Sequence, residues 1–480
     1  MSEPTGNRSA GAVAADLLIR AGKAGNRALA RRTGGEERAK VVLVLAAVLA
    51  LSSADASTVG ASATHLRSSL GISNTDIGLL VSVTSIVGAV ASIPFGLLAD
   101  RVRRTWLLGS AIILWGLAMI WSATVPDFGQ LLLARVCLGG VTAVAGPVVA
   151  SLTGDYFPSS DRGRIYGYIL AGELIGAGVG FGVTGDIAAL SWRAAFVILA
   201  LPAFALAWFV FTLREPERGS TAEGTEGASP TDAQRLADDQ GIEPEPELVL
   251  DRDPAHMGLI AATRYILRVR TNIVLIAASA LGYYFLAGVQ TFGIEFVTHQ
   301  YRINQALANG LLLVVGGGAV VGVLAGGTIG DRLLKRGYLN GRVLVAAISA
   351  SLCVVLFVPA LLVRDASTAL PYIVFAALAL SAQNPPLDAA RLDVMVPLLW
   401  GRAEGVRTFL RTMAQALAPL LFGAVSDYVF GGGRNGLKWT FVVMLVPLAG
   451  SAVFLVRGLR TYPRDVATAA ASTARVGSGS

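Results

Sequence analysis

The sequence predicts an all-α membrane protein with twelve transmembrane helices arranged as two pseudo-symmetric six-helix halves. Three observations lead to this prediction: the composition, the length of the apolar runs and an internal repeat. Of the 480 residues, 54% are hydrophobic and 15% are charged, and the mean hydropathy is +0.62. A soluble domain carries about 25% charged residues. This chain therefore has too few charges to cover a surface that faces water.

Twelve apolar stretches are long enough to cross a bilayer, because about 20 apolar residues match a hydrocarbon core of about 30 Å. We expect these spans at residues 41–66, 75–100, 105–124, 129–153, 163–187, 193–213, 271–299, 306–330, 341–363, 370–397, 404–428 and 437–457. The 55 glycines suit helices that pack closely through small side chains. The first span imitates a cleavable signal peptide, but about 40 residues precede it and many spans follow, so we interpret it as a membrane helix.

The spans divide the chain into five segments. These are a basic N-terminal tail at 1–40, a six-helix half at 41–213, a linker with an amphipathic segment at 214–270, a second six-helix half at 271–457 and a C-terminal tail at 458–480. The N-terminal tail is compatible with an amphipathic helix on the membrane surface or with a disordered segment. The linker is rich in Glu, Asp, Pro, Gly and Ser, which is typical of a flexible segment.

The charge distribution predicts orientation. The net charge of +7 could indicate nucleic-acid binding, but the basic residues gather at the ends of the apolar runs on one side of the predicted membrane. We therefore expect both termini in the cytoplasm, a location in the inner (plasma) membrane and no nucleic-acid partner. Cys137 and Cys353 lie in apolar runs without ligands at metal spacing, so we expect buried thiols and neither a metal nor a cofactor.

Two polar loops form an internal repeat. A glycine, an Asp-Arg pair and a later basic residue recur at matching offsets after the second and the eighth span. They are Gly96, Asp100, Arg101 and Arg104 in the first loop, and Gly327, Asp331, Arg332 and Lys335 in the second. A second repeat pairs Pro147 and Pro158 with Pro386 and Pro397 at the same spacing. These repeats predict two homologous halves, as in transporters built from parallel repeats.

The two loops resemble the signature cytoplasmic loops of the major facilitator superfamily, and the resemblance covers nearly all of the chain after residue 40. It implies the major facilitator fold and a secondary active transporter that works by alternating access, rather than an enzyme. In that family the loop charges latch the cytoplasmic ends of the two halves together in the outward-open state. The resemblance therefore implies a cytoplasmic gate, and the alternative is ordinary topogenic charge. The implied gate residues are Asp100, Arg101, Arg104, Asp331, Arg332 and Lys335.

A finer resemblance is to the spinster-like branch, which moves lysophospholipids and sphingoid phosphates. It rests on Asp55 in the first span, Arg135 in the fourth, and the segments at 155–158 and 161–164. In that branch a Glu seven residues after the fourth-span Arg helps to carry the proton. Here that position is Thr142, so the family's proton relay is incomplete. The glycine-rich run at 176–182 lacks the Gly-Pro of the antiporter signature, which leaves the direction of transport open.

Ionisable residues at bilayer depth are candidates for function, because a charge there is costly. Asp55 and Arg135 could meet across a central cavity, either as a proton switch or as a permanent salt bridge between two helices. Glu173 lies mid-span in the fifth helix, where it could carry the proton in place of Thr142 or simply face water.

Three further sites carry charge near the ends of spans. Glu295 and His299 are one turn apart near the outer end of the seventh span, where Glu295 could contact a proton or the substrate. Arg411 lies deeper in the eleventh span than Arg407 and would suit an anionic headgroup, or pair with a carboxylate or a helix-end carbonyl.

In the tenth span, Arg391 is expected to pair with Asp388, with Asp393 or with both.

The sequence holds no Walker loop, no nucleophile–base arrangement and only three His, which disfavours an ATP-driven pump or an enzyme. We predict a monomeric, proton-coupled transporter for a hydrophobic or amphipathic molecule or a lysolipid. One alternative is an importer or facilitator of a small polar solute such as a sugar or an organic acid. Another is a non-transporting receptor or scaffold, which would not need Asp55, Arg135 and Glu173 in the bilayer.

Overall fold

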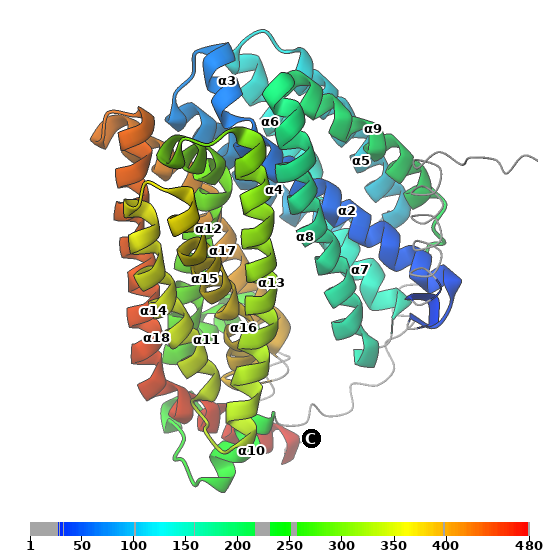
Figure 1. Ribbon diagram of the computed structural model, residues 1–480. Coiled ribbons are helices and arrows are strands. Elements are labelled where there is room, and N and C mark those ends of the chain that lie inside the picture. Colours follow the sequence, from blue (N-terminus) through cyan, green and yellow to red (C-terminus); the bar gives the residue numbers. More distant parts are fainter. Residues whose placement is uncertain are drawn as a thin grey trace, which may run out of the picture.

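The computed structural model describes residues 27, 29–31, 33–99, 102–157, 159–216, 231–250, 257–396 and 399–478. Most of the predicted N-terminal tail therefore lies outside the described residues, as do Asp100 and Arg101 of the first polar loop. Twelve helices in the described part are long and apolar enough to cross a membrane. The structure confirms the predicted fold class and an integral multi-pass membrane protein (Figure 1).

The first half contains six spans, of which the fourth is built from two consecutive helices. They are α2 (Glu36–Ala61), α4 (Asn74–Ala99), α5 (Arg104–Thr124), α6 (Phe128–Thr142) with α7 (Ala145–Tyr156), α8 (Ser159–Leu190) and α9 (Trp192–Phe211). The short helix α3 (Ala63–Leu70) joins the first two spans.

The second half repeats this plan, and its fourth span is again built from two helices. The elements are α12 (Arg270–Tyr301), α13 (Gln305–Lys335), α14 (Gly341–Leu362), α15 (Ala366–Ala382) with α16 (Asn384–Asp393), α17 (Trp400–Ala424) and α18 (Gly433–Ser478). A π-helical turn, Val425–Val429, extends α17.

The two broken spans fall where the sequence repeats its prolines. The α6–α7 break precedes Pro147, and the α15–α16 break precedes Pro385 and Pro386. Proline cannot donate a backbone hydrogen bond and its ring clashes with the preceding turn, so it favours a break at this point. Non-helical backbone at membrane depth is tolerated where protein or a cavity surrounds it. The breaks thus mark equivalent interior positions in the two halves.

Glycines let the first and fifth spans approach each other. Gly172, Gly176 and Gly180 of α8 face the backbone of α2, and a methyl group added at Gly176 would collide with the carbonyl oxygen of Ala50. Such close contact is how small residues hold membrane helices together. Helix packing therefore accounts for Gly176 and Gly180, the first and third glycines of the glycine-rich run, while Gly182 on the same helix has open space around it.

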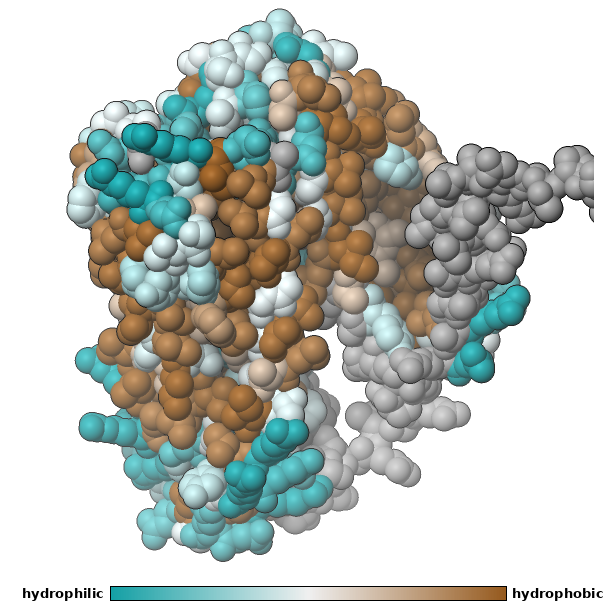
Figure 2. All heavy atoms as spheres, in the orientation of Figure 1, coloured by the Kyte–Doolittle hydropathy of each residue, from teal (hydrophilic) through white to brown (hydrophobic). Residues whose placement is uncertain are grey.

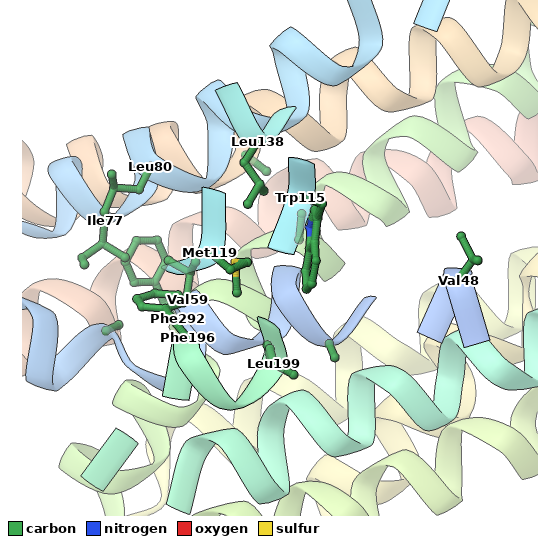
Figure 3. Packing of buried hydrophobic residues seen from close by; sticks show 14 of the residues in the cluster. Val48, Val59, Ile77, Leu80, Trp115, Met119, Leu138, Phe196, Leu199 and Phe292 are labelled. Atoms are coloured by element: carbon green, nitrogen blue, oxygen red, sulfur yellow. The ribbon is translucent and has the colours of Figure 1, made fainter. Parts of the chain in front are cut away.

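Apolar side chains fill the interior of the first half. Figure 3 shows Trp115 and Met119 of α5 beside Leu138 of α6 and the α9 residues Phe196 and Leu199. Cys353 is buried as expected, but Cys137 is exposed, because it lies on the outward face of α6, one turn from the exposed Leu133. Figure 2 shows an apolar band across the face of the molecule in view, with hydrophilic residues toward both ends.

The described parts of the linker, residues 231–250 and 257–270, are more ordered than its composition suggests. Helix α10 (Asp232–Asp239) begins at a capping box of Thr231 and Gln234, and the Gln234 side chain donates to the carbonyl of Asp393 at 3.0 Å. Further along, the backbone NH of Glu245 donates to Thr468 Oγ1 at 2.8 Å. The predicted amphipathic segment contains α11 (Leu259–Ile266). The predicted C-terminal tail continues α18 as a helix and packs against the linker.

The two halves meet at one end of the molecule and diverge toward the other (Figure 1). We call the end that carries α3 the sealed face, and the end that carries α10 the open face. Hydrogen bonds between the halves gather at the sealed face: Gln305 Nε2 donates to the carbonyls of Ala61 and Gly185, and the Thr75 hydroxyl donates to Asp427 at 2.7 Å. Figure 2 shows the gap between the halves on the way to the open face.

We expect Gly176→Ala to lower the melting temperature of the protein in lipid nanodiscs, because over-packing a tight helix contact costs about 1–3 kcal/mol. Gly182→Ala is the matched control: it makes the same change on the same helix but has open space, and it should leave the melting temperature unchanged or slightly raised. Equal effects of the two substitutions would contradict the proposed role of Gly176 in packing α8 on α2.

Candidate functional site

A cavity of about 780 Å³ lies between the halves. Its walls come from α2, α4, the α6–α7 break and α17, so both halves contribute. The lining combines small apolar residues with hydroxyl side chains, among them Ser52, Thr84, Thr142, Thr408 and Thr412. Pockets of about 300–1,000 Å³ hold drug-sized ligands, so this cavity can take a small molecule.

A buried ion pair lies in the cavity wall. Arg135 Nη1 donates to Asp55 Oδ1 at 2.9 Å, and the two residues are 2% and 4% exposed. The structure thus brings together the two residues that sequence depth placed near each other. The Arg135 guanidinium also lies over the Phe196 ring, 4.7 Å from its centroid. Its Nε and Nη2 atoms are buried without a hydrogen-bond partner among the described residues. Asp55 therefore supplies the counter-charge for Arg135.

Thr142 closes helix α6 and faces the same cavity. Its hydroxyl donates to the carbonyl of Gly139 at 3.1 Å, a local bond within its own helix. A hydroxyl cannot carry a proton as a carboxylate does at neutral pH. The position where the spinster-like branch holds a Glu is thus close to the ion pair but does not titrate, which leaves Asp55 as the acid of this wall.

A second group of charged residues is centred on Arg411 of α17, in the second half. The Arg411 guanidinium lies over the ring of Tyr283, 4.5 Å from its centroid, and its Nε atom has no hydrogen-bond partner in the described part of the chain. Glu173 of α8 is exposed and interacts electrostatically with Arg411 across the two halves. The structure therefore relates Glu173 to a partner on α17 that its own helix does not provide.

The charged residues around Arg411 are paired with acids. Arg407 contacts Asp388 at 2.6 Å and Glu404 at 2.8 Å, and Arg391 also pairs with Glu404. The expectation that Arg391 pairs with Asp388 or Asp393 is wrong. Helical spacing indicates which residues share a depth but not which neighbouring helix each one faces, and Glu404 of α17 is the nearer acid.

Asp393 instead belongs to a separate buried network. It accepts from Arg342 at 2.6 Å and from the Tyr462 hydroxyl at 2.6 Å. Arg342 also pairs with Asp331 at 2.8 Å. This network joins α13, α14, α16 and α18 at the open face. Tyr462 lies in the segment predicted as a tail, and only its aromatic character in a polar stretch hinted at burial.

The described gate residues contact their own halves in this conformation. Arg104 is buried and pairs with Asp155 and, at 2.8 Å, with Glu215. Burial would raise the pKa of Glu215, but hydrogen bonds from Arg104 and Thr105 outweigh it and hold the pKa below its ordinary value. Arg332 and Lys335 are exposed at the end of α13. Because the open face is the separated end, a latch across it is a prediction for the opposite conformation.

Glu295 lies in the contact between the halves at the sealed face. It is 1% exposed and pairs with Arg67 of α3, while His299 Nδ1 lies 3.9 Å from the same carboxylate oxygen. The sequence placed Glu295 at an outer gate but did not indicate Arg67 as its partner. Arg67 is the basic residue of the first loop on that side, which was the available signal.

Comparisons with known proteins agree with this architecture. Residues 45–395 match the family described as Major Facilitator Superfamily. The chain is 30% identical to the probable L-galactonate transporter of Escherichia coli (strain K12) over 175 residues, which cover 36% of this chain and 38% of that protein. It is 25% identical to Protein spinster of Drosophila melanogaster over 192 residues, which cover 40% and 32%. The matches thus span less than half the length of these relatives.

The fold also matches a solved structure. A bacterial homolog of the human lysosomal transporter spinster, in an inward-facing and unoccupied conformation, superposes with a TM-score of 0.72. The superposition covers 89% of this chain and 98% of that chain, with 18% sequence identity. At this identity the likeness bears on the fold alone.

We expect Arg135→Met to reduce stability by about 3–5 kcal/mol, because it leaves the Asp55 carboxylate buried without its counter-charge. The double variant Asp55→Asn/Arg135→Met should recover much of this loss, since it removes both charges. Melting temperatures of the parent, both single variants and the double variant in nanodiscs form the double-mutant cycle. Additive losses would show that the two side chains do not stabilise each other.

Proposed function

The chain belongs to the Major Facilitator Superfamily and is a secondary transporter; we propose that a proton gradient drives it and that its cargo is an amphipathic anion such as a lysolipid. The observation that carries this proposal is the buried Asp55–Arg135 pair in the wall of a cavity that both halves line. An ionisable pair at membrane depth, open to a cavity, is the arrangement that proton-driven transporters need.

Protonation of Asp55 would change the energy of this conformation. In the ionised state Asp55 neutralises Arg135 at 2.9 Å. A proton on Asp55 removes that counter-charge, and an unpaired buried charge costs several kcal/mol. Conformations that hydrate Arg135, or that give it an anionic partner, then become favoured. A proton can shift the equilibrium between two conformations only through such a difference in binding energy.

We propose that the open face is cytoplasmic, that both termini lie on that side and that the membrane is the inner (plasma) membrane. The support is the excess of basic residues on this side. The structure then corresponds to an inward-facing state. In the outward-facing state the loop residues Asp100, Arg101, Arg104, Asp331, Arg332 and Lys335 would close the cytoplasmic end. Because one chain supplies both walls of the cavity, we propose that it works as a monomer.

Arg411 is our candidate for the anionic group of the cargo. Its guanidinium stacks on Tyr283, its Nε atom lacks a hydrogen-bond partner among the described residues, and it interacts electrostatically with Glu173 of the other half. A guanidinium binds phosphate and carboxylate through paired hydrogen bonds. The apolar and hydroxyl-lined cavity beside α17 would receive the rest of the molecule. The resemblance of the sequence to the spinster-like branch, which implies a lysolipid cargo, supports a lipid-like cargo for this chain.

A sugar acid is the second candidate cargo. The 30% identity to a probable L-galactonate transporter supports it, and Arg411 could bind a carboxylate as well as a phosphate. Sugar hydroxyls need several amide or charged partners, however. In the cavity wall these are Asp55, Arg135 and Gln415, of which the first two already bind each other. The wall therefore favours an amphipathic molecule.

We expect proteoliposomes with an imposed proton gradient to move a fluorescent lysophospholipid, and Asp55→Asn to abolish this gradient dependence. The substitution removes the titrating group but keeps the size of the side chain. A lipophilic cationic dye and a labelled hexuronate, assayed in parallel, distinguish the cargo classes. The exposed Asp239→Asn is the matched control and should transport as the parent does. Unchanged gradient-driven transport by Asp55→Asn would assign Asp55 a purely structural role.

We expect Arg411→Gln to raise the KM for the anionic cargo by about tenfold, because a hydrogen bond to a charged group contributes about 1.5–3 kcal/mol. Arg411→Lys should retain part of the affinity. The exposed Arg460→Gln removes the same charge from another helix and should leave the KM unchanged. If the KM of Arg411→Gln equals that of the parent while gradient dependence persists, the anion binds elsewhere and the proton switch stands.

A further inference from the structure

A compact group of charged residues seals the face opposite the open end. The Glu295 carboxylate of α12 pairs with Arg67 of α3 through Oε1, and α3 and α12 belong to different halves. Its second oxygen, Oε2, is buried and has no hydrogen-bond partner among the described residues. Glu295 thus has few polar partners for its charge, and its bond to Arg67 is one of the contacts that hold the halves together.

A histidine lies beside the same oxygen. His299 is one helical turn after Glu295, its Nδ1 lies 3.9 Å from Glu295 Oε1, and its side chain is 42% exposed. Arg67 is 26% exposed. Both side chains therefore contact the water of the sealed face as well as approaching Glu295. Histidine changes its charge between about pH 5 and pH 8, so this one would respond to the compartment that the sealed face contacts.

Other charged groups surround the pair on the elements packed against this end of α12. His65 precedes Arg67 on α3 and hydrogen-bonds Gln305 of α13 at 2.9 Å. Asp427, after α17, accepts from Thr75 and acts electrostatically on Arg67. Lys438 lies near the start of α18. Two of the three histidines of the sequence, His65 and His299, thus lie at the sealed face, and His65 bonds to the other half.

We propose that Glu295 and His299 form a second proton-binding site, which releases the Arg67–Glu295 contact when the compartment at the sealed face becomes acidic. A proton on His299 creates an ion pair with Glu295 inside one helix. The same proton places a second positive charge next to Arg67, which repels it. Glu295 is then held within its own half, and the contact across the halves weakens.

This site is distinct from the Asp55–Arg135 pair. Asp55 and Arg135 lie in the wall of the central cavity, whereas Glu295 and His299 lie at the sealed face. The second site depends neither on the identity of the cargo nor on a proton that crosses the membrane. It would set the pH at which the sealed face opens, because a ligand that binds one conformation better shifts the equilibrium toward it.

Spin-label distances across the sealed face test the proposal. With Cys137 and Cys353 replaced by Ser, labels at Ser69→Cys in the last turn of α3 and Arg364→Cys between α14 and α15 report on the two halves from exposed positions. In nanodiscs, we expect the population with the longer distance to increase at least threefold, roughly, between about pH 7.5 and pH 5.5. Glu295→Gln should show the longer distance at both pH values.

The histidine variants decide the assignment. Asp55→Asn alone should keep a pH response, because it removes the central titrating group and leaves this site in place. In the Asp55→Asn background, adding His299→Gln should abolish the response, whereas adding His65→Gln, which removes the other histidine of the same face, should keep it. A response that persists in Asp55→Asn/His299→Gln, disappears in Asp55→Asn/His65→Gln, or is missing from Asp55→Asn would overturn the proposal.

Discussion

A charge at membrane depth must find its counter-charge within the protein, and this constraint organises both halves of the molecule. In the first half it produces a lone buried pair, Asp55 with Arg135, in the wall of the cavity, while the buried Arg104 nearer the open face pairs with both Asp155 and Glu215. In the second half it produces networks, in which Asp393 binds both Arg342 and Tyr462. A network that satisfies several atoms tolerates one protonation, whereas a lone pair does not. The lone pair is therefore the place where a proton has the largest effect.

The contacts between the halves explain how such an effect could reach the membrane surface. At the sealed face, the backbones of α4 and α17 touch where Gly78 meets Pro419 and where Gly423 meets Asn74. These two helices are therefore either packed closely or fully separated. Closely packed surfaces change between discrete arrangements rather than deforming gradually. The polar bonds of Gln305 and Asp427 lie in the same layer. Opening this face requires that these bonds break together. A change in any one of them therefore changes the free energy of opening.

The sequence predicted the depth of each charged side chain in the membrane well, but it did not predict which neighbouring helix each side chain faces. Hydropathy located the twelve spans, and depth alone suggested that Asp55 could meet Arg135, because both are mid-membrane charges of opposite sign. It failed for Arg391, whose partner Glu404 depends on how α16 and α17 are rotated toward each other. Composition also concealed the packed linker, although Thr231 and Gln234 form a recognisable capping box and Ala233 and Ala237 are buried on one face. This packing depends on the surfaces of α16 and α18, which cannot be read from the linker sequence alone.

The acid proposed to bind the proton and the arginine proposed to bind the anion lie in different halves, and this determines how the two binding events can be coupled. Asp55, the acid that would take the proton, lies on α2, whereas Arg411, whose Nε atom lacks a hydrogen-bond partner among the described residues, lies on α17. A proton and an anion that bind in different halves do not compete for one group. Their coupling must then pass through the relative position of the halves, to which Glu173 of α8 contributes through its electrostatic interaction with Arg411. Thr142, in place of an acid, keeps the first half from holding a second proton near Arg135. Because that wall contains one acidic side chain among its described residues, each transport cycle would carry at most one proton through it.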